Sequence, residues 1–264
     1  MMIGAHPDDC DFSAGGCAAL WRRAGLEVCF LSATNGDAGH HQQGGGALAQ
    51  RRAAECRAAG EVLGIAYTAL DLHDGELVPS LENRRAIIRA IRGFAPDLLL
   101  THRPCDYHAD HRYTSLLVQD ASFLLTVPNL CPDVPALADL PVIAYTFDAF
   151  AKPAPFAPDL AVDIGPVLDD KTRMAHCHAS QVYEWLPWLG RYEVPATPDE
   201  RLAWLAANVA ARSRRVAEHC RAALVSQYGP ARGAAVTAAE AFELCEYGAD
   251  LTAERRRLLF PFLD

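Results

Sequence analysis

The chain has 264 residues, with 24 basic and 33 acidic side chains and a formal net charge of −9. Its length allows one domain with a large core, and its acidic balance argues against a surface for nucleic acid or anionic membranes, because both need clustered Lys and Arg. Nine cysteines without a CxxC pair fit free thiols in a reducing compartment, and no apolar run approaches the length of a membrane span. The sequence therefore predicts a cytoplasmic protein without a leader peptide.

The first 100 residues alternate between short apolar segments and helical segments. The predicted strands are residues 1–3, 28–33, 66–70 and 97–102. The predicted helices are residues 17–24, after a turn at Gly15-Gly16, and residues 47–63 and 81–94. A glycine-rich loop, residues 34–46, follows the second strand, at the edge where open α/β sheets bind ligands. This alternation predicts an α/β fold, a Rossmann-like and mostly parallel sheet flanked by helices.

The second half of the chain predicts fewer strands. A helix is expected to begin near Tyr113, and residues 127–158 are proline-rich and irregular around one strand-like run, residues 142–147. Residues 169–186 and 203–228 have helical character, which predicts a helical C-terminal elaboration. Glu240 and Glu243 are expected to lie on one face of a helix.

The first chemically informative motif is His6-Pro7-Asp8-Asp9, directly after the first strand. Pro7 restricts the backbone, and neighbouring aspartates cannot point in the same direction. One carboxylate can therefore bind a cation while the other faces the water that the cation carries, as metal-assisted hydrolysis requires. The alternative is a simple turn in which an aspartate caps the next helix.

The second motif is His108-Ala109-Asp110-His111, which follows another buried strand. Two histidines three residues apart lie on one side of a helical turn, so that one can bind a metal while the other faces the same ion. Asp110 can orient a ring by accepting its N–H. Because both motifs follow the carboxyl ends of parallel strands, they are expected to meet at one edge of the sheet.

On these motifs the chain resembles the LmbE-like, or PIG-L, family of metal-dependent N-deacetylases over residues 1–181. The resemblance also rests on Thr34-Asn35-Gly36-Asp37, Arg52, Glu55, Asp74-Gly75, Arg103-Pro104, Lys171 and His178-Ala179-Ser180-Gln181. It implies a single deacetylase domain over residues 1–264, in which residues 182–264 form a subgroup-specific C-terminal part.

The resemblance implies a role for each matching residue. His6, Asp9 and His111 would hold Zn²⁺ or another divalent metal. Asp8 would be the general base and His108 would stabilise the oxyanion, oriented by Asp110.

Contacts with the substrate are expected from Arg103, Asp37 and His178, although a structural salt bridge would explain Arg103 equally well. The chain departs from the family at Cys10 and Asp37, where the family usually has glutamate. Cys10 is expected to fill a small buried space rather than to bind the metal.

The resemblance therefore predicts a metal-dependent hydrolase that removes an N-acyl group, expected to be acetyl, from an amino sugar or a related small conjugate. The alternatives are an amidase that acts on a larger amide conjugate and a catalytically silent α/β binding module. A dinucleotide-dependent oxidoreductase is disfavoured because the GxGxxG pattern is missing. The sequence leaves open whether the protein is a homo-oligomer.

Overall fold

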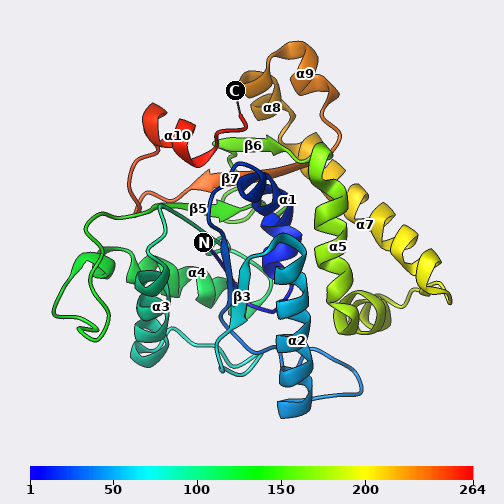
Figure 1. Cartoon of the computed structure of the whole chain (residues 1–264), viewed down its shortest axis with the longest axis horizontal. Helices are drawn as coiled ribbons and strands as arrows, with labels where there is room; N and C mark the ends of the chain where they lie inside the picture. Colours follow the sequence, from blue (N-terminus) through cyan, green and yellow to red (C-terminus); the bar gives the residue numbers. More distant parts are fainter. Residues whose placement is uncertain (264) are drawn as a thin grey trace.

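Seven strands form one mixed sheet in the order β3-β2-β1-β4-β5-β7-β6 in the computed structural model, which describes residues 1–263 (Figure 1). Strands β1 to β5 are mutually parallel, and β7 is antiparallel to both of its neighbours, β5 and β6. The strands are β1 (Met2–Gly4), β2 (Cys29–Ser32), β3 (Ala66–Ala69), β4 (Leu98–Thr101), β5 (Val142–Thr146), β6 (Leu160–Asp163) and β7 (Ala239–Leu244). The predicted fold class is confirmed.

Helices cover both faces of the sheet. The α-helices are α1 (Asp9–Arg23), α2 (Gly45–Leu63), α3 (Leu81–Phe94), α4 (Ala109–Ala121), α5 (Leu168–Cys177), α6 (Leu186–Gly190), α7 (Pro198–His219), α8 (Arg221–Tyr228), α9 (Pro230–Ala235) and α10 (Ala253–Leu259). Two 3₁₀ turns, η1 (Phe123–Thr126) and η2 (Gly165–Val167), and one π-helical turn, η3 (Ser180–Trp185), complete the chain. No helix within residues 1–263 is long and apolar enough to cross a membrane.

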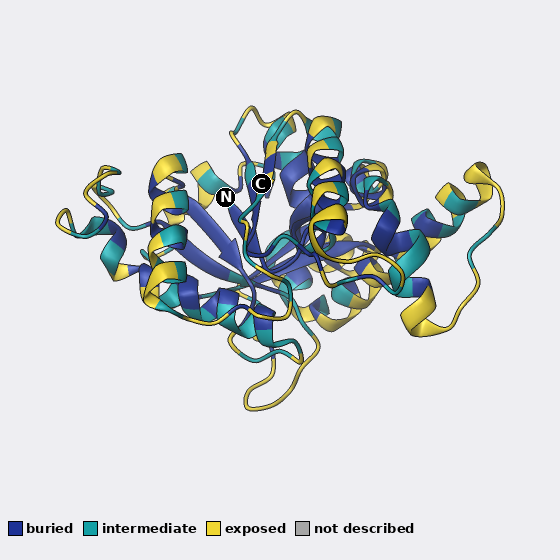
Figure 2. Cartoon of the chain, turned by 90° about the horizontal axis from the view of Figure 1, so that it is seen from below, coloured by how far each residue is buried: buried dark blue, intermediate teal, exposed yellow. Residues whose placement is uncertain are grey.

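The sheet separates two apolar cores, and Figure 2 shows its buried strands between helices whose outer faces are exposed. One core packs α1, α2 and α5 against the sheet, and the other packs α3 and α4. On the second face, Ile87, Ile88 and Ile91 of α3 are fully buried at helical spacing. Helix α7 packs against α5 and β7 at the far end of the sheet.

Strands β1 and β4 are neighbours in the centre of the sheet and point the same way. The segments that leave their carboxyl ends, at Gly4 and Thr101, therefore lie side by side. Backbone N–H groups of Ala33 and Thr34 donate to the carbonyls of Gly4 and Ala5, which extends the β1–β2 ladder into the first motif. The sheet thus fixes the backbone from which the first motif projects.

Helix α1 begins at Asp9, eight residues before the predicted start at Cys17. The prediction took Gly15-Gly16 for a turn, but both residues lie within the helix. A Cβ atom at Gly16 would lie only 2.8 Å from the side chain of Ile164. Glycine is therefore required there for the close approach of α1 to its neighbour and does not end a helix.

Glu240 and Glu243 both lie on β7, and Glu240 is 3 % exposed, so the prediction that the two belong to a helix face is wrong. The Glu240 carboxylate accepts backbone N–H groups of Gly16 and Cys17 at 2.8 and 2.7 Å and pairs with Lys171 at 2.6 Å. Lys171 also donates to the Phe12 carbonyl at 2.9 Å. This buried ion pair ties the middle of α1 to the last strand of the chain.

The C-terminal helices differ from the prediction in their limits. The expected helix over residues 203–228 is two helices, α7 and α8, separated at Cys220. Helix α7 begins earlier, at Pro198, because Thr197 and Glu200 form a capping box and proline suits the first helical position. Helix α4 begins at Ala109, so the second motif forms its first turn.

Candidate metal centre

The first turn of the site connects β1 to α1 and is held by the side chain of Asp9. Its Oδ2 accepts backbone N–H groups from Ala5 at 3.0 Å and from His6 at 2.7 Å. Asp8 has a positive φ of 133°, a conformation that costs a residue with a side chain about 1–3 kcal/mol. The two carboxylates diverge, because Asp9 faces the histidines of the site while Asp8 faces Arg52.

The second turn connects β4 to α4. His108 is the N-cap of α4, and its Nδ1 accepts the backbone N–H of Asp110 at 3.2 Å. The backbone N–H of His108 in turn donates to the carboxylate of Asp106 at 2.8 Å. His111 follows in the first turn of the helix and points back toward the first motif, with its ring 5.2 Å from that of His6.

Three donor atoms from these turns lie at the separations that one tetrahedral metal ion requires. His6 Nδ1 is 3.4 Å from Asp9 Oδ2 and 3.3 Å from His111 Nε2, and the latter two atoms are 3.5 Å apart. Two donors bound to Zn²⁺ at roughly 2.0–2.1 Å with a tetrahedral angle lie about 3.3–3.4 Å apart. The three predicted ligands therefore fit the metal.

The opposite ring nitrogen of each histidine ligand faces a carboxylate. His6 Nε2 lies 3.1 Å from Asp74 Oδ1 and 3.3 Å from Asp110 Oδ2, and His111 Nδ1 lies 3.1 Å from Asp106 Oδ2. A carboxylate holds the proton on the nitrogen that it faces and leaves the other nitrogen free as a metal donor. The surroundings thus prepare both rings for a metal ion.

The predicted partner of Asp110 requires a correction. The sequence assigned its carboxylate to the ring of His108, but the structure places this carboxylate against His6 Nε2 and the backbone N–H of Gly75. His108 receives only the backbone N–H of Asp110. The reason is that Asp110 is the second residue of α4 and its carboxylate faces the ring of His6, whereas the His108 side chain caps the N-terminus of the helix.

A fourth imidazole, His102, belongs to the cluster and was missed by the motif search. Its Nε2 lies 3.2 Å from Asp9 Oδ2, and its ring stacks on that of His111 at 4.1 Å. Burial lowers the pKa of His102. Burial disfavours the ionised form of Asp9, but His111 and His102 outweigh it and hold the pKa of Asp9 well below its usual value. Its position directly after a buried strand was the feature of the sequence from which His102 could have been predicted to join the site.

Asp8 stands beside the three donors in a different environment. Its Oδ1 lies 3.4 Å from the guanidinium of Arg52, which is itself buried and also donates to the Pro7 carbonyl. Its backbone N–H donates to the Tyr67 hydroxyl at 2.9 Å. Burial raises the pKa of Asp8 to about 6, against the opposing effect of Arg52. A carboxylate with a pKa in this range is suited to accept a proton near neutral pH.

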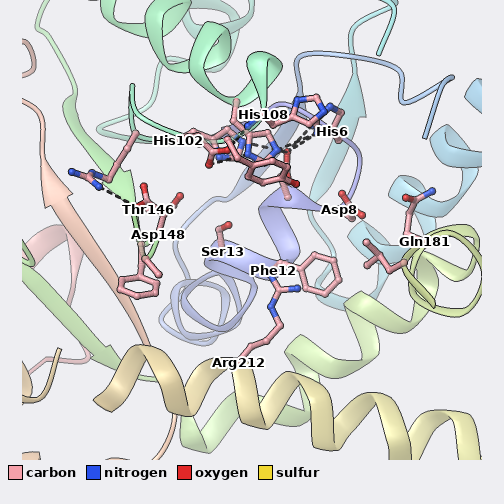
Figure 3. Close-up of a pocket in the computed structure, with 18 of the residues that line it drawn as sticks. His6, Asp8, Phe12, Ser13, His102, His108, Thr146, Asp148, Gln181 and Arg212 are labelled. Carbon is pink, nitrogen blue, oxygen red and sulfur yellow. Dashed lines mark hydrogen bonds and ion pairs between the residues drawn. The ribbon is translucent and has the colours of Figure 1, made fainter. Parts of the chain in front are cut away.

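The cluster opens into a cavity of about 770 Å³, a size typical of sites for small molecules. Figure 3 shows His6, His102 and His108 on one side of this cavity and Arg212 on the other. Asp8 and His108 both line it, so both can reach a bound ligand. Burial and the nearby His6 lower the pKa of His108, which favours its neutral ring.

Arg103 lines the cavity, but its guanidinium is already occupied. It pairs with Asp148 at 3.0 Å and with Glu243 at 3.1 Å, and it donates to the carbonyls of Phe150 and Ala154. The structure thus favours the salt-bridge interpretation over a substrate contact.

Asp37 and His178 do not line the cavity, so the structure gives no support to their prediction as substrate contacts. The carboxylate of Asp37 turns back to the following loop, where it accepts from His73 at 2.6 Å and from the backbone of Asp74 at 3.0 Å. His178 is fully buried and pairs with Asp11 at 2.9 Å. The Asp37 carboxylate is thus occupied by the protein itself, whereas His178 is buried away from the cavity and its Nδ1 has no hydrogen-bond partner among the described residues.

Cys10 points away from the donors. It is fully buried, its Sγ faces the carbonyls of Met2 and Leu31, and burial raises the pKa of the thiol well above its usual value. A protonated thiol in the core fills space and is no metal ligand.

Comparisons with known proteins agree with this geometry. The family model PIG-L, GlcNAc-PI de-N-acetylase, matches residues 1–122. Diacetylchitobiose deacetylase of Thermococcus kodakarensis is 31% identical over 201 residues, which cover 72% of this chain and 74% of the relative. 4-Oxalmesaconate hydratase of Pseudomonas putida is 25% identical over 194 residues, 70% of this chain and 74% of that protein.

The fold also matches a solved structure, N,N'-diacetylchitobiose deacetylase from Pyrococcus horikoshii in complex with an inhibitor. The TM-score is 0.71 at 22% identity, and the match covers 93% of this chain and 83% of the other. Together with the sequence identity to the deacetylase of T. kodakarensis, these findings show that the chain belongs to the PIG-L family of de-N-acetylases.

Proposed function

We propose that the protein is a metal-dependent hydrolase that removes an acetyl group from the nitrogen of an amino sugar or a related small conjugate. The observation that carries the proposal is the arrangement of His6, Asp9 and His111, whose donor atoms lie 3.3–3.5 Å apart beside the separate carboxylate of Asp8. The deacetylases among the relatives support the same reaction.

In this proposal His6, Asp9 and His111 hold a divalent metal, preferably Zn²⁺, because two imidazoles and one carboxylate leave a coordination position open. A metal ion held there would lower the pKa of a water molecule and polarise the substrate carbonyl. Asp8 accepts the proton of the attacking water and delivers it to the leaving amine. Its position beside the donors and its raised pKa suit this role.

His108 stabilises the negative charge that develops on the carbonyl oxygen. Its Nδ1 accepts a backbone N–H, so the proton of the neutral ring lies on Nε2 and is available to the substrate. Asp110, Asp74 and Asp106 orient the two histidine ligands.

The test compares the two neighbouring aspartates on purified, metal-loaded protein. Asp8→Asn is expected to retain the metal and lower turnover by about 10²–10⁴-fold, whereas Asp9→Asn should lose metal affinity. His108→Ala should resemble Asp8→Asn. Metal content and acetate release from a panel of N-acetylated sugars measure both effects. An Asp8→Asn protein without metal, beside an Asp9→Asn protein that retains it, would reverse the two roles.

A second candidate is the addition of water to a carbon–carbon double bond of an unsaturated carboxylic acid, which the relationship to 4-oxalmesaconate hydratase favours. The same metal-binding residues and base would serve this reaction. Loss of the ultraviolet absorbance of a conjugated diacid, without acetate release from any amide, would identify it. The alternative of an amidase that acts on a larger amide conjugate is tested by adding extended N-acyl conjugates to the panel. A protein that is inactive towards every compound would favour the catalytically silent binding module.

A further inference from the structure

Helix α7 forms the wall of the cavity opposite the metal-binding residues. It presents one face to the cavity, made of Arg212, Ser213, Arg215, Val216 and His219. These residues recur at the spacing of one helix face. Figure 3 shows Arg212 extending from α7 toward Phe12 and the metal-binding cluster. This wall lies outside the part of the chain that the family model matches.

Arg212 and Arg215 have no carboxylate partner within the part of the chain that the structure describes. The other cationic side chains of the cavity are all engaged, since Arg52 pairs with Asp8, Arg103 with Asp148 and Lys171 with Glu240. The guanidinium of Arg212 lies over an aromatic face, with its carbon 4.6 Å from the centre of the Phe12 ring.

The two arginines also repel each other. Arg212 and Arg215 are both exposed to the solvent of the open cavity, and partial desolvation at the cavity wall, joined by the charge of Arg215, lowers the pKa of Arg212. Arginine nevertheless remains charged at any physiological pH. The carboxylates of Asp8 and Asp9, which line the same cavity, act in the opposite sense and favour the charged form of Arg212.

Ser213, between the two arginines, adds an independent observation. Its side chain is 2% exposed and lines the same cavity, yet its Oγ has no hydrogen-bond partner among the described residues. Buried hydroxyls are normally paired, so an unpaired one at a cavity wall points to a partner supplied by a ligand.

We propose that the substrate carries an anionic group, a carboxylate or a phosphate, that binds Arg212 and Arg215 while its reacting amide lies at the metal-binding residues. Guanidinium groups bind both kinds of anion through paired N–H donors, and Ser213 adds a hydroxyl. This inference rests on the proposed deacetylation and restricts its substrates to acetylated amino sugars that carry an acidic group. The arrangement gives the anion a fixed place across the cavity from the reaction, which orients the amide.

The kinetic test uses Arg212→Gln and Arg215→Gln, with Arg214→Gln as the matched control on the same helix. Arg214 lies between the two but does not line the cavity. The metal-loaded proteins are assayed with N-acetylglucosamine, its 6-phosphate and N-acetylmuramic acid, so that a neutral, a phosphorylated and a carboxylated sugar are compared. Whichever of the last two is hydrolysed faster identifies the anion.

The wild-type protein is expected to prefer an anionic sugar in kcat/KM. Each cavity variant should lose about 10–100-fold on that sugar, mainly through KM, and clearly less on the neutral one, since hydrogen bonds to charged groups are stronger than neutral ones. Arg214→Gln should match the wild type. A preference for the neutral sugar, or equal losses on neutral and anionic sugars, overturns the inference and leaves deacetylation intact.

Binding of inorganic phosphate, measured by calorimetry on the same metal-loaded proteins, separates the inference from the proposed function. If no sugar releases acetate but phosphate binding weakens in Arg212→Gln and Arg215→Gln and not in Arg214→Gln, deacetylation is wrong and the anion site remains. If phosphate affinity is the same in all four proteins and no anionic sugar is preferred, the anion site is wrong.

Discussion

Replacing Asp8 by glycine is expected to give a more stable protein than replacing it by alanine, although both variants lose the proposed base. Asp8 holds its backbone at φ 133°, in a region that glycine enters freely and that residues with a Cβ atom avoid. Both substitutions remove the carboxylate and its contact with Arg52, so these losses cancel in the comparison. The difference between the variants isolates the backbone strain.

The size of the difference follows from two opposing terms. Strain of this kind costs a residue with a Cβ atom about 1–3 kcal/mol, and only alanine retains it. Glycine is more flexible in the unfolded chain, which lowers the stability of the glycine variant by about 0.4–1 kcal/mol and so offsets part of its advantage. The glycine variant is therefore expected to exceed the alanine variant by about 1–2 kcal/mol, which corresponds to roughly 2–8 °C in Tm for a domain of this size.

Urea and thermal unfolding, followed by circular dichroism, measure the difference. Both proteins are studied without metal, because a bound ion adds its own binding free energy to the folded state. Asp71→Gly and Asp71→Ala, on an exposed residue that is not among those with positive φ, provide the control pair, in which alanine should be the more stable. An Asp8→Ala protein as stable as Asp8→Gly would refute the strain argument.

Asp110→Asn is expected to weaken metal binding by about 10–100-fold, because an amide no longer fixes the proton on His6 Nε2. Equilibrium dialysis measures the affinity, with the exposed Asp120→Asn as the control. An Asp110→Asn protein that binds the metal as tightly as the control would count against the prediction. Glu240→Ala should lower the free energy of unfolding by about 3–5 kcal/mol, since it leaves Lys171 buried and unpaired. The double variant Lys171→Met/Glu240→Ala should recover part of this loss in urea unfolding, and a loss equal to the sum of the effects of Lys171→Met and Glu240→Ala would contradict the pairing. Chelation should remove metal and activity but not the helical circular dichroism signal, and simultaneous loss of both would indicate a structural ion.

The two turns that carry the predicted metal donors could be located from the sequence, because the polar side chains of each turn lie close together in the chain. His6 and Asp9 are three residues apart and His111 lies in the first turn of a helix, so local rules of strand ends and helix faces indicate where the polar side chains gather. The choice of these three residues as the ligand set came from the family resemblance and stays a prediction. The parallel order of β1 and β4 then brings the two turns together. The same rules gave the α/β fold class, because it follows from the alternation of short apolar and helical segments.

The supporting contacts could not be predicted in this way. His102, Asp106 and Asp74 reach the donors only through the particular path of each loop, which no spacing in the sequence reveals. Glycines also misled the prediction, since Gly15 and Gly16 serve close packing within a helix and not a turn. Asp37 and His178 were predicted as substrate contacts from the family resemblance, but in space the Asp37 carboxylate accepts from His73 and His178 is buried against Asp11.

The contact between Glu240 and α1 has a consequence for the order in which the protein matures during translation. The three predicted metal donors leave the ribosome within the first 111 residues, but the carboxylate that accepts the N–H groups of Gly16 and Cys17 is synthesised far later, on β7. Until then, those two N–H groups and the ammonium of Lys171 lack the acceptor that the finished fold gives them. A nascent chain can therefore expose the donor residues to cellular metal ions before α1, which carries Asp9, is anchored, and final positioning of the centre waits for the last strand.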